Sequence, residues 1–146
     1  TADEIIAKWK TYPAAQIVWE QFVEFLGKWR TDQKKKSKWN APIVAGANII
    51  KYDMIIAQRL CEKYGNTDKK KEQNIFHPRD MIDILSICFL WFEGHEDPPV
   101  SYSMDNLRPY FGLSRENAHD ALSDVRACGS IIMKFLEFHI LLNQHT

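Results

Sequence analysis

PIVAGAN, residues 42–48, predicts a short buried β-strand. The stretch contains small and β-branched residues, begins with a proline and stops at the polar Asn48. An apolar helical run follows and ends at Tyr64, before Gly65. Asp53 comes between the strand and the helix, at the carboxyl end of a strand, where α/β proteins place their ligands. An aspartate there is also a common helix N-cap, and the two roles are compatible.

A second informative stretch, AHDALSDVRA at residues 118–127, lies at the entry of a predicted long helix. Asp124 can hold Mg²⁺ or Mn²⁺ through its carboxylate oxygens. His119, five residues earlier, can take a proton near neutral pH. In mid-helix these side chains would point about 140° apart, but a histidine in the loop before the helix can swing back over the face that carries Asp124. A metal ligand beside a movable base suggests metal-assisted hydrolysis.

The stretch 118–127 resembles the third exonuclease motif of the DEDDh 3′→5′ exonucleases, the proofreading-subunit-like branch of the ribonuclease H-like superfamily. In that family the histidine is the general base, and the aspartate five residues later is a metal ligand. The resemblance therefore implies that His119 is a catalytic base and that Asp124 is both a catalytic residue and a metal ligand.

Residues 42–53 resemble the second motif of the same family, in which an asparagine is followed five residues later by an aspartate. The resemblance implies a catalytic and metal-binding role for Asp53 and a substrate contact for Asn48. Ala47 departs from the pattern, because the family often has histidine directly before the asparagine.

The first motif of the family, Asp-x-Glu on the first strand of the sheet, has no counterpart in the sequence. Asp3 and Glu4 have the wrong spacing and lie in a predicted helix start. The chain therefore resembles the C-terminal two-thirds of a single exonuclease domain over residues 1–146, with roughly fifty residues and the first strands expected in front. The implied fold is an α/β, ribonuclease H-like exonuclease fold, N-terminally incomplete and mostly helical in the part present.

The function implied by the resemblance is that of a metal-dependent 3′→5′ exonuclease. Such an enzyme removes nucleotides from DNA 3′ ends by two-metal phosphodiester hydrolysis, so two Mg²⁺ or Mn²⁺ ions are expected in the complete domain. The expected partner is the 3′ end of single-stranded DNA. One alternative is oligoribonuclease-like trimming of short RNA, which a preference for the 2′-OH would identify. The other is a catalytically inactive fragment that binds nucleic acid or a partner.

Composition favours a globular protein of a reducing, cytoplasmic compartment. Lys+Arg and Asp+Glu each number 19 among 146 residues, which disfavours strong non-specific adhesion to nucleic acid without excluding an acidic site. The three cysteines lie far apart in apolar runs and are expected to be free thiols. No membrane span or signal peptide is predicted. The bare edge of strand 42–48 is expected to favour self-association or a partner strand.

Helices are predicted for much of the remaining chain. Gln16–Trp29 is amphipathic, and its aromatic stripe is expected to be core. Asp83–Phe92 is apolar nearly all round and is expected to be a buried helix capped by Asp83. A short strand is considered at Ile75–Pro78, and the lysine-rich stretches around residues 34–38 and 69–71 are expected to be solvated loops.

The C-terminal part is expected to contain two further helices. Ser103 caps a short helix that runs through Tyr110 and ends at Gly112. The last helix is predicted over residues 120–142, with these side chains buried: Val125, Cys128, Ile132, Phe135 and Leu136. Asp120, one turn before Asp124, is either a second metal ligand or a partner of the helix dipole.

Overall fold

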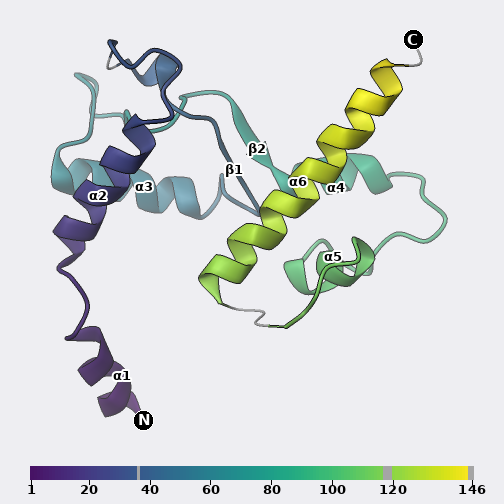
Figure 1. Ribbon diagram of the computed structural model, residues 1–146, viewed down its shortest axis with the longest axis horizontal. Helices are drawn as coiled ribbons and strands as arrows, with labels where there is room; N and C mark the ends of the chain where they lie inside the picture. Colours follow the sequence, from purple (N-terminus) through teal and green to yellow (C-terminus); the bar gives the residue numbers. More distant parts are fainter. Residues whose placement is uncertain (36, 117–119, 145–146) are drawn as a thin grey trace. The chain divides into compact units, whose positions relative to one another are not determined.

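The computed structural model describes residues 1–35, 37–116 and 120–144 (Figure 1). About 54% of the chain is helical, and the strands of the described part form a two-stranded parallel sheet. The chain divides into two compact units, each built from two separate stretches. Unit 1 contains Thr1–Pro42 and Ile56–Arg79, and unit 2 contains Ile43–Ile55 and Asp80–Thr146. The chain therefore passes between the units three times.

Unit 1 contains these helices: α1 (Ala2–Trp9), α2 (Ala15–Gly27), the 3-10 helix η1 (Lys38–Asn40) and most of α3 (Asp53–Tyr64). A capping box starts α1, because the Thr1 hydroxyl accepts from the Glu4 amide and the Glu4 side chain reaches back to Thr1. The predicted helix start is confirmed. The helix predicted before Gly65 is also confirmed, and Gly65 ends it with a φ of +80°, which glycine adopts without strain.

Helix α2 is confirmed, but the stripe expected to be core is buried only at Leu26 and is exposed at Val18, Phe22, Phe25 and Trp29. The helix buries Trp19 and Leu26, while Phe25 remains about half exposed. Trp19 Nε1 donates to Asn66 Oδ1 at 2.7 Å, and the Trp19 ring centroid lies 6.2 Å from that of Tyr64. The end of α3 and the loop after it therefore cover the Trp19 side of α2, whereas the predicted stripe lay on a neighbouring side.

The segment after α3 is ordered by the buried amide of Gln73. Its Oε1 accepts from the backbone amides of Ile75 at 3.0 Å and Phe76 at 2.9 Å, and its Nε2 donates to the Phe76 carbonyl at 3.2 Å. A side chain thus satisfies backbone groups that a sheet would otherwise pair. The strand considered at Ile75–Pro78 is accordingly a wrong prediction, and this segment is irregular.

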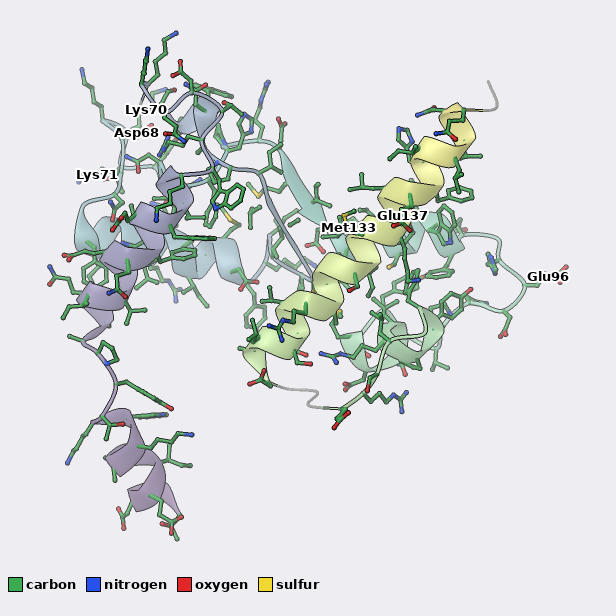
Figure 2. The ribbon with its side chains drawn as sticks, in the orientation of Figure 1. Asp68, Lys70, Lys71, Glu96, Met133 and Glu137 are labelled. Atoms are coloured by element: carbon green, nitrogen blue, oxygen red, sulfur yellow. The ribbon has the colours of Figure 1, made fainter. Side chains whose placement is uncertain are left out.

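An ion-pair cluster fixes the loop between residues 67 and 73. Lys38 Nζ contacts Asp68 Oδ2 at 2.8 Å and also contacts the Glu72 carboxylate. Asp68 Oδ1 accepts from the backbone amide of Lys70 at 2.8 Å (Figure 2). The bonds to Asp68 and Glu72 raise the pKa of Lys38, and the bond from Lys38 lowers the pKa of Asp68. The lysine run 69–71 is a loop, as predicted.

Unit 2 contains the parallel strands β1 (Val44–Gly46) and β2 (Met81–Asp83), with Val44 opposite Met81 and Gly46 opposite Asp83. The strand predicted at residues 42–48 is confirmed in its centre. It is shorter than predicted because the chain turns at Asn48, whose φ is +58°. Strand β2 was missed, because three residues directly before a helix carry no readable periodicity.

The core of unit 2 lies where three helices meet: α4 (Ile84–Phe92), α5 (Met104–Tyr110) and α6 (Ala121–Asn143) (Figure 1). Its most deeply buried side chains are Ile84, Cys88, Phe92, Leu107 and Ile131. Asp83 caps α4 by accepting from the Leu85 amide, as predicted. The expected burial all round α4 is wrong, because one stripe at four-residue spacing faces the core and leaves Phe89 and Leu90 exposed.

Helix α6 is confirmed, but part of its predicted core face is wrong. Ala127 and Ile131 are buried, and the predicted residues Cys128, Ile132 and Phe135 lie partly buried against the core. Val125 is 68% exposed because it lies about 160° around the helix from Ala127. Leu136 is also exposed, next to the exposed Met133 and Glu137 (Figure 2).

The cysteines are free thiols, two buried and one partly buried. Burial raises the pKa of Cys61 and of Cys88 to about 11. None of the described helices combines the length and apolarity that crossing a bilayer requires.

Candidate active site

Asp83 ties together the carboxyl ends of the two strands. Its Oδ1 accepts from the backbone amide of Asn48, just after β1, and from that of Leu85, at the start of α4, each at 3.0 Å. Asp83 is buried, so both bonds form in a protected environment. The carboxylate thereby holds Asn48, the predicted substrate contact, in its left-handed conformation at the end of the sheet.

Gly46, two residues before Asn48, lies in tight approach to the Ile49 side chain. A Cβ placed on Gly46 would come within 2.6 Å of Ile49 Cγ2, and the Ile49 side chain is buried. Such a contact is too short for a larger residue unless the turn shifts. The Met54 amide donates to the Ile49 carbonyl at 2.9 Å, so this turn leads directly into α3.

Asp53 is the first residue of α3 and is exposed to solvent. It lies in the first helical turn rather than at the N-cap position of the alternative interpretation. A carboxylate in this turn is stabilised by the positive end of the helix dipole. Asp53 therefore presents its oxygens from a fixed helix end in unit 2.

Asp124 lies in the first turn of α6 and forms an ion pair with Arg108 of α5. Arg108 Nη2 is 2.5 Å from Asp124 Oδ1, and the two side chains are 2% and 40% exposed. Asp120 is the N-cap of α6, because its Oδ2 accepts from the Ser123 amide at 3.0 Å. This position agrees with the role of helix-dipole partner considered for Asp120, and the role of metal ligand stays a prediction.

Cys128 lies one turn after Asp124 on α6, and its thiol accepts a hydrogen bond from the backbone next to β1. Burial is the main cause of its raised pKa, a hydrogen bond from the Ala47 backbone opposes the rise, and the charges of Asp124 and Asp53 add to it. Helix α6, which carries Asp124, packs against β1, the strand that precedes Asp53.

His119, the predicted base, lies outside the described residues. Among residues 1–35, 37–116 and 120–144, no group of three or more histidine, cysteine, aspartate and glutamate side chains is arranged to hold a metal ion. The described part of the chain thus supplies two candidate carboxylate ligands, Asp53 and Asp124, which is fewer than a two-metal site contains.

A hollow of about 340 Å³ lies at the same end of the sheet, within unit 2. It is lined by Asn48, Ile50, Lys51, Asp83, Leu85, Ser86 and Phe89. Three of the lining side chains are apolar, and Asn48, Lys51, Asp83 and Ser86 add polar groups. Neither Asp53 nor Asp124 lines it, so the hollow shares Asn48 and Asp83 with the candidate site but not the two proposed metal ligands.

Two residues of the site escaped the sequence analysis. Arg108 was not singled out, because an arginine on a short helix is normally exposed and nothing in its sequence neighbourhood signals burial. Asp83 was predicted as a cap, and its second bond to Asn48 depends on strand pairing that the sequence did not reveal.

Comparison with known proteins adds no family assignment: no protein-family model, curated protein or solved structure matches the chain.

Proposed function

We propose that this chain forms part of the active site of a metal-dependent 3′→5′ exonuclease that hydrolyses phosphodiester bonds at DNA 3′ ends. One observation carries the proposal: α6, whose first turn holds Asp124, packs against β1, the strand that leads to Asp53, so the two motifs paired by the resemblance lie on neighbouring elements. Sites for a cation and a phosphate substrate typically lie at the carboxyl end of parallel strands.

The donor set fits a hard divalent cation such as Mg²⁺ or Mn²⁺. Both residues offer carboxylate oxygens, and Asp53 and Asp124 each keep solvent-accessible surface. Two protein carboxylates hold such an ion weakly, because Mg²⁺ retains its waters unless further carboxylates or substrate phosphates replace them. When bound, the cation would supply an activated water and stabilise charge on the scissile phosphate.

The chain's own residues take distinct parts in this proposal. The carboxylate oxygens of Asp53 and Asp124 would bind the divalent cation. Asn48 would contact the terminal nucleotide. His119 accepts the proton of the attacking water, because imidazole is half protonated near neutral pH. Asp83 fixes the backbone at Asn48 and so keeps this contact residue in place.

A second candidate function is that of a non-catalytic module that binds nucleic acid or a partner. It is favoured by the ion pair that already engages Asp124 and by the lack of a three-ligand group among the described residues. Activity and metal binding therefore have to be measured separately.

The test uses single-stranded DNA labelled at its 5′ end, with Mn²⁺, and an RNA of the same sequence. The 146-residue chain is compared with a longer form that carries a strand ending in Asp-x-Glu before Thr1. We expect weak hydrolysis by the short form and successive shortening from the 3′ end by the long one. In the long form, His119→Ala should lower the rate about 10²–10⁴-fold near pH 7 and spare Mn²⁺ binding.

Asp53→Asn and Asp124→Asn should each lower both the rate and the binding of Mn²⁺. The matched control is Asp105→Asn, which changes an exposed aspartate in the first turn of α5. Faster trimming of the RNA than of the DNA would reassign the substrate. Binding of DNA without any hydrolysis by the long form would favour the second candidate function instead.

A further inference from the structure

Arg108 is the most deeply buried charged side chain beside the candidate site. It is 2% exposed and follows Leu107, which is fully buried in the unit 2 core. Its Nη2 donates to Asp124 Oδ1 at 2.5 Å, and both Nη atoms lie 3.3 Å from Ser123 Oγ. Its Nη1 also donates to the Ser114 carbonyl at 3.0 Å. One guanidinium thus joins α5 to the start of α6 and to the loop between them.

Stability alone does not account for this arrangement. Taking a guanidinium out of water is costly, and a buried ion pair recovers that cost only when every polar atom is satisfied. Arg108 Nε has no hydrogen-bond partner within the described residues. An apolar side chain of similar size would avoid both costs, so the contacts made by the two Nη atoms need another explanation.

The ion pair is asymmetric in a way that suggests a role in aiming the carboxylate. Arg108 is sealed in the core, while Asp124 is 40% exposed. The guanidinium therefore contacts Asp124 from the protein side and restrains rotation of the carboxylate. Ser123 is restrained as well, because its amide is held by Asp120 and its Oγ contacts Arg108. The whole first turn of α6 is thus fixed around one carboxylate.

We infer that Arg108 is a positioning residue, which orients Asp124 so that the solvent-facing side of its carboxylate meets a divalent cation. This inference rests on the proposed function, in which Asp124 is a metal ligand. Partners that orient a metal ligand without touching the metal typically contribute 10–100-fold to metal affinity or activity. The positive charge of Arg108 also repels a bound metal ion. Neutralising Arg108 should therefore weaken metal binding if orientation of Asp124 dominates, and strengthen it if charge repulsion dominates.

The experiment titrates Mn²⁺ into the ¹⁵N-labelled 146-residue chain and follows paramagnetic broadening of the α6 first-turn amides, which detects weak binding without any nuclease assay. We expect Arg108→Gln to raise the Mn²⁺ concentration for half-maximal broadening about 10-fold or more. Arg108→Lys keeps the charge but loses the planar fork and should give an intermediate value. The matched control is Arg126→Gln, which removes an exposed charge two residues from Asp124 and should not weaken binding.

The outcomes separate this inference from the proposed function. If Asp124→Asn abolishes the broadening but Arg108→Gln leaves it unchanged or strengthens it, Arg108 does not position the ligand and the proposed site survives. If Asp124→Asn leaves the broadening unchanged, the proposed metal site itself is wrong. The same spectra report folding through the dispersion of the Leu107 and Ile131 signals. Should Arg108→Gln unfold the chain, Arg108→Lys decides, and wild-type broadening in that variant would overturn the inference.

Discussion

Unit 2 gathers apolar side chains from three helices in one cluster and also buries Arg108, whereas in unit 1 the buried Gln73 orders a segment without regular secondary structure. In unit 2, α4, α5 and α6 bring together side chains with almost no exposed surface. In unit 1, the buried Trp19 donates to Asn66, and the buried Gln73 serves the backbone of Ile75 and Phe76. Apolar burial is non-directional, while each of these hydrogen bonds requires a particular geometry.

The difference bears on where a site can be built. Arg108 can restrain Asp124 because it is enclosed by a continuous core, which lets one guanidinium hold several partners. The principal ion pair of unit 1 involves Lys38, whose partners Asp68 and Glu72 lie on a surface loop. Lysine offers a point charge without the planar fork of arginine, so this pair closes a loop but does not aim a carboxylate.

The largest expected effect comes from opening the core of unit 2. Ile131→Ala should lower the free energy of unfolding by about 2–5 kcal/mol, because it removes buried methylenes and leaves a cavity. The matched control, Ile140→Ala on the same helix, changes a side chain that is more than half exposed and should cost less than about 0.5 kcal/mol. Urea denaturation measures both values.

Amide hydrogen exchange on the same variants tests whether the units respond separately. Ile131→Ala should reduce protection in α4 and α6 more than in the part of α3 that belongs to unit 1. Equal loss of protection in both units would mean that they unfold as one cooperative body, and the contrast drawn between them would fail.

An intermediate effect is expected for Gln73→Leu in unit 1. The change keeps side-chain bulk but leaves the buried amides of Ile75 and Phe76 without their acceptor, at a cost of about 1–3 kcal/mol. Gln16→Leu is the control, since Gln16 is exposed and bonds to Glu20 on the surface. Amide hydrogen exchange in α3 measures the effect. If Gln73→Leu and Gln16→Leu reduce protection in α3 equally, the buried amide of Gln73 is not important for unit 1.

The smallest expected effect is the pH dependence of the Lys38 cluster. The pKa of Asp68 is lowered, so its contribution to stability is present above its ordinary pKa of 3.8 and lost as the pH falls below it. The pKa of Lys38 is raised, so its contribution is present below 10.5 and lost as the pH rises through the raised value. The thermal unfolding midpoint, measured against pH, should fall at both the acid and the alkaline end. Asp68→Asn should remove the fall at the acid end.

High salt serves as the control for that pH series, because exposed charges are screened by ions. Salt should flatten the wild-type curve toward that of Asp68→Asn. If the thermal midpoint of the wild-type chain falls at acid pH as steeply in high salt as in low salt, carboxylates other than Asp68 cause the loss of stability.

Local signals in the sequence located the elements well. The helix start at Asp3 and Glu4, the glycine after Tyr64 and the cap at Asp83 each depend on a few neighbouring residues, and all three are present in the structure. The centre of the strand at residues 42–48 was likewise readable from its small and β-branched residues.

What the sequence could not supply was which face of each helix finds cover. Val125 and Phe25 are as apolar as their buried neighbours, yet they are exposed because no described element packs over them. Strand β2 and the bond between Asp83 and Asn48 depend on pairing between distant segments. For the site, motif spacing nominated Asp53, His119 and Asp124, but Arg108 became visible through its contacts, since nothing in its sequence neighbourhood names Asp124 as its partner.

The ribosome synthesises the chain from its N-terminus, so the segments of the two units are made alternately. Gly46 pairs with Asp83, which is made 37 residues later. At about 5–20 residues per second, strand β1 waits roughly 2–7 s for β2 to be made. Unit 1 is complete in sequence at Arg79, before β2 exists, so the nascent chain can hold one finished unit and one unpaired strand together. Residues 43–55 are therefore the stretch where a chaperone on the nascent chain would be needed first.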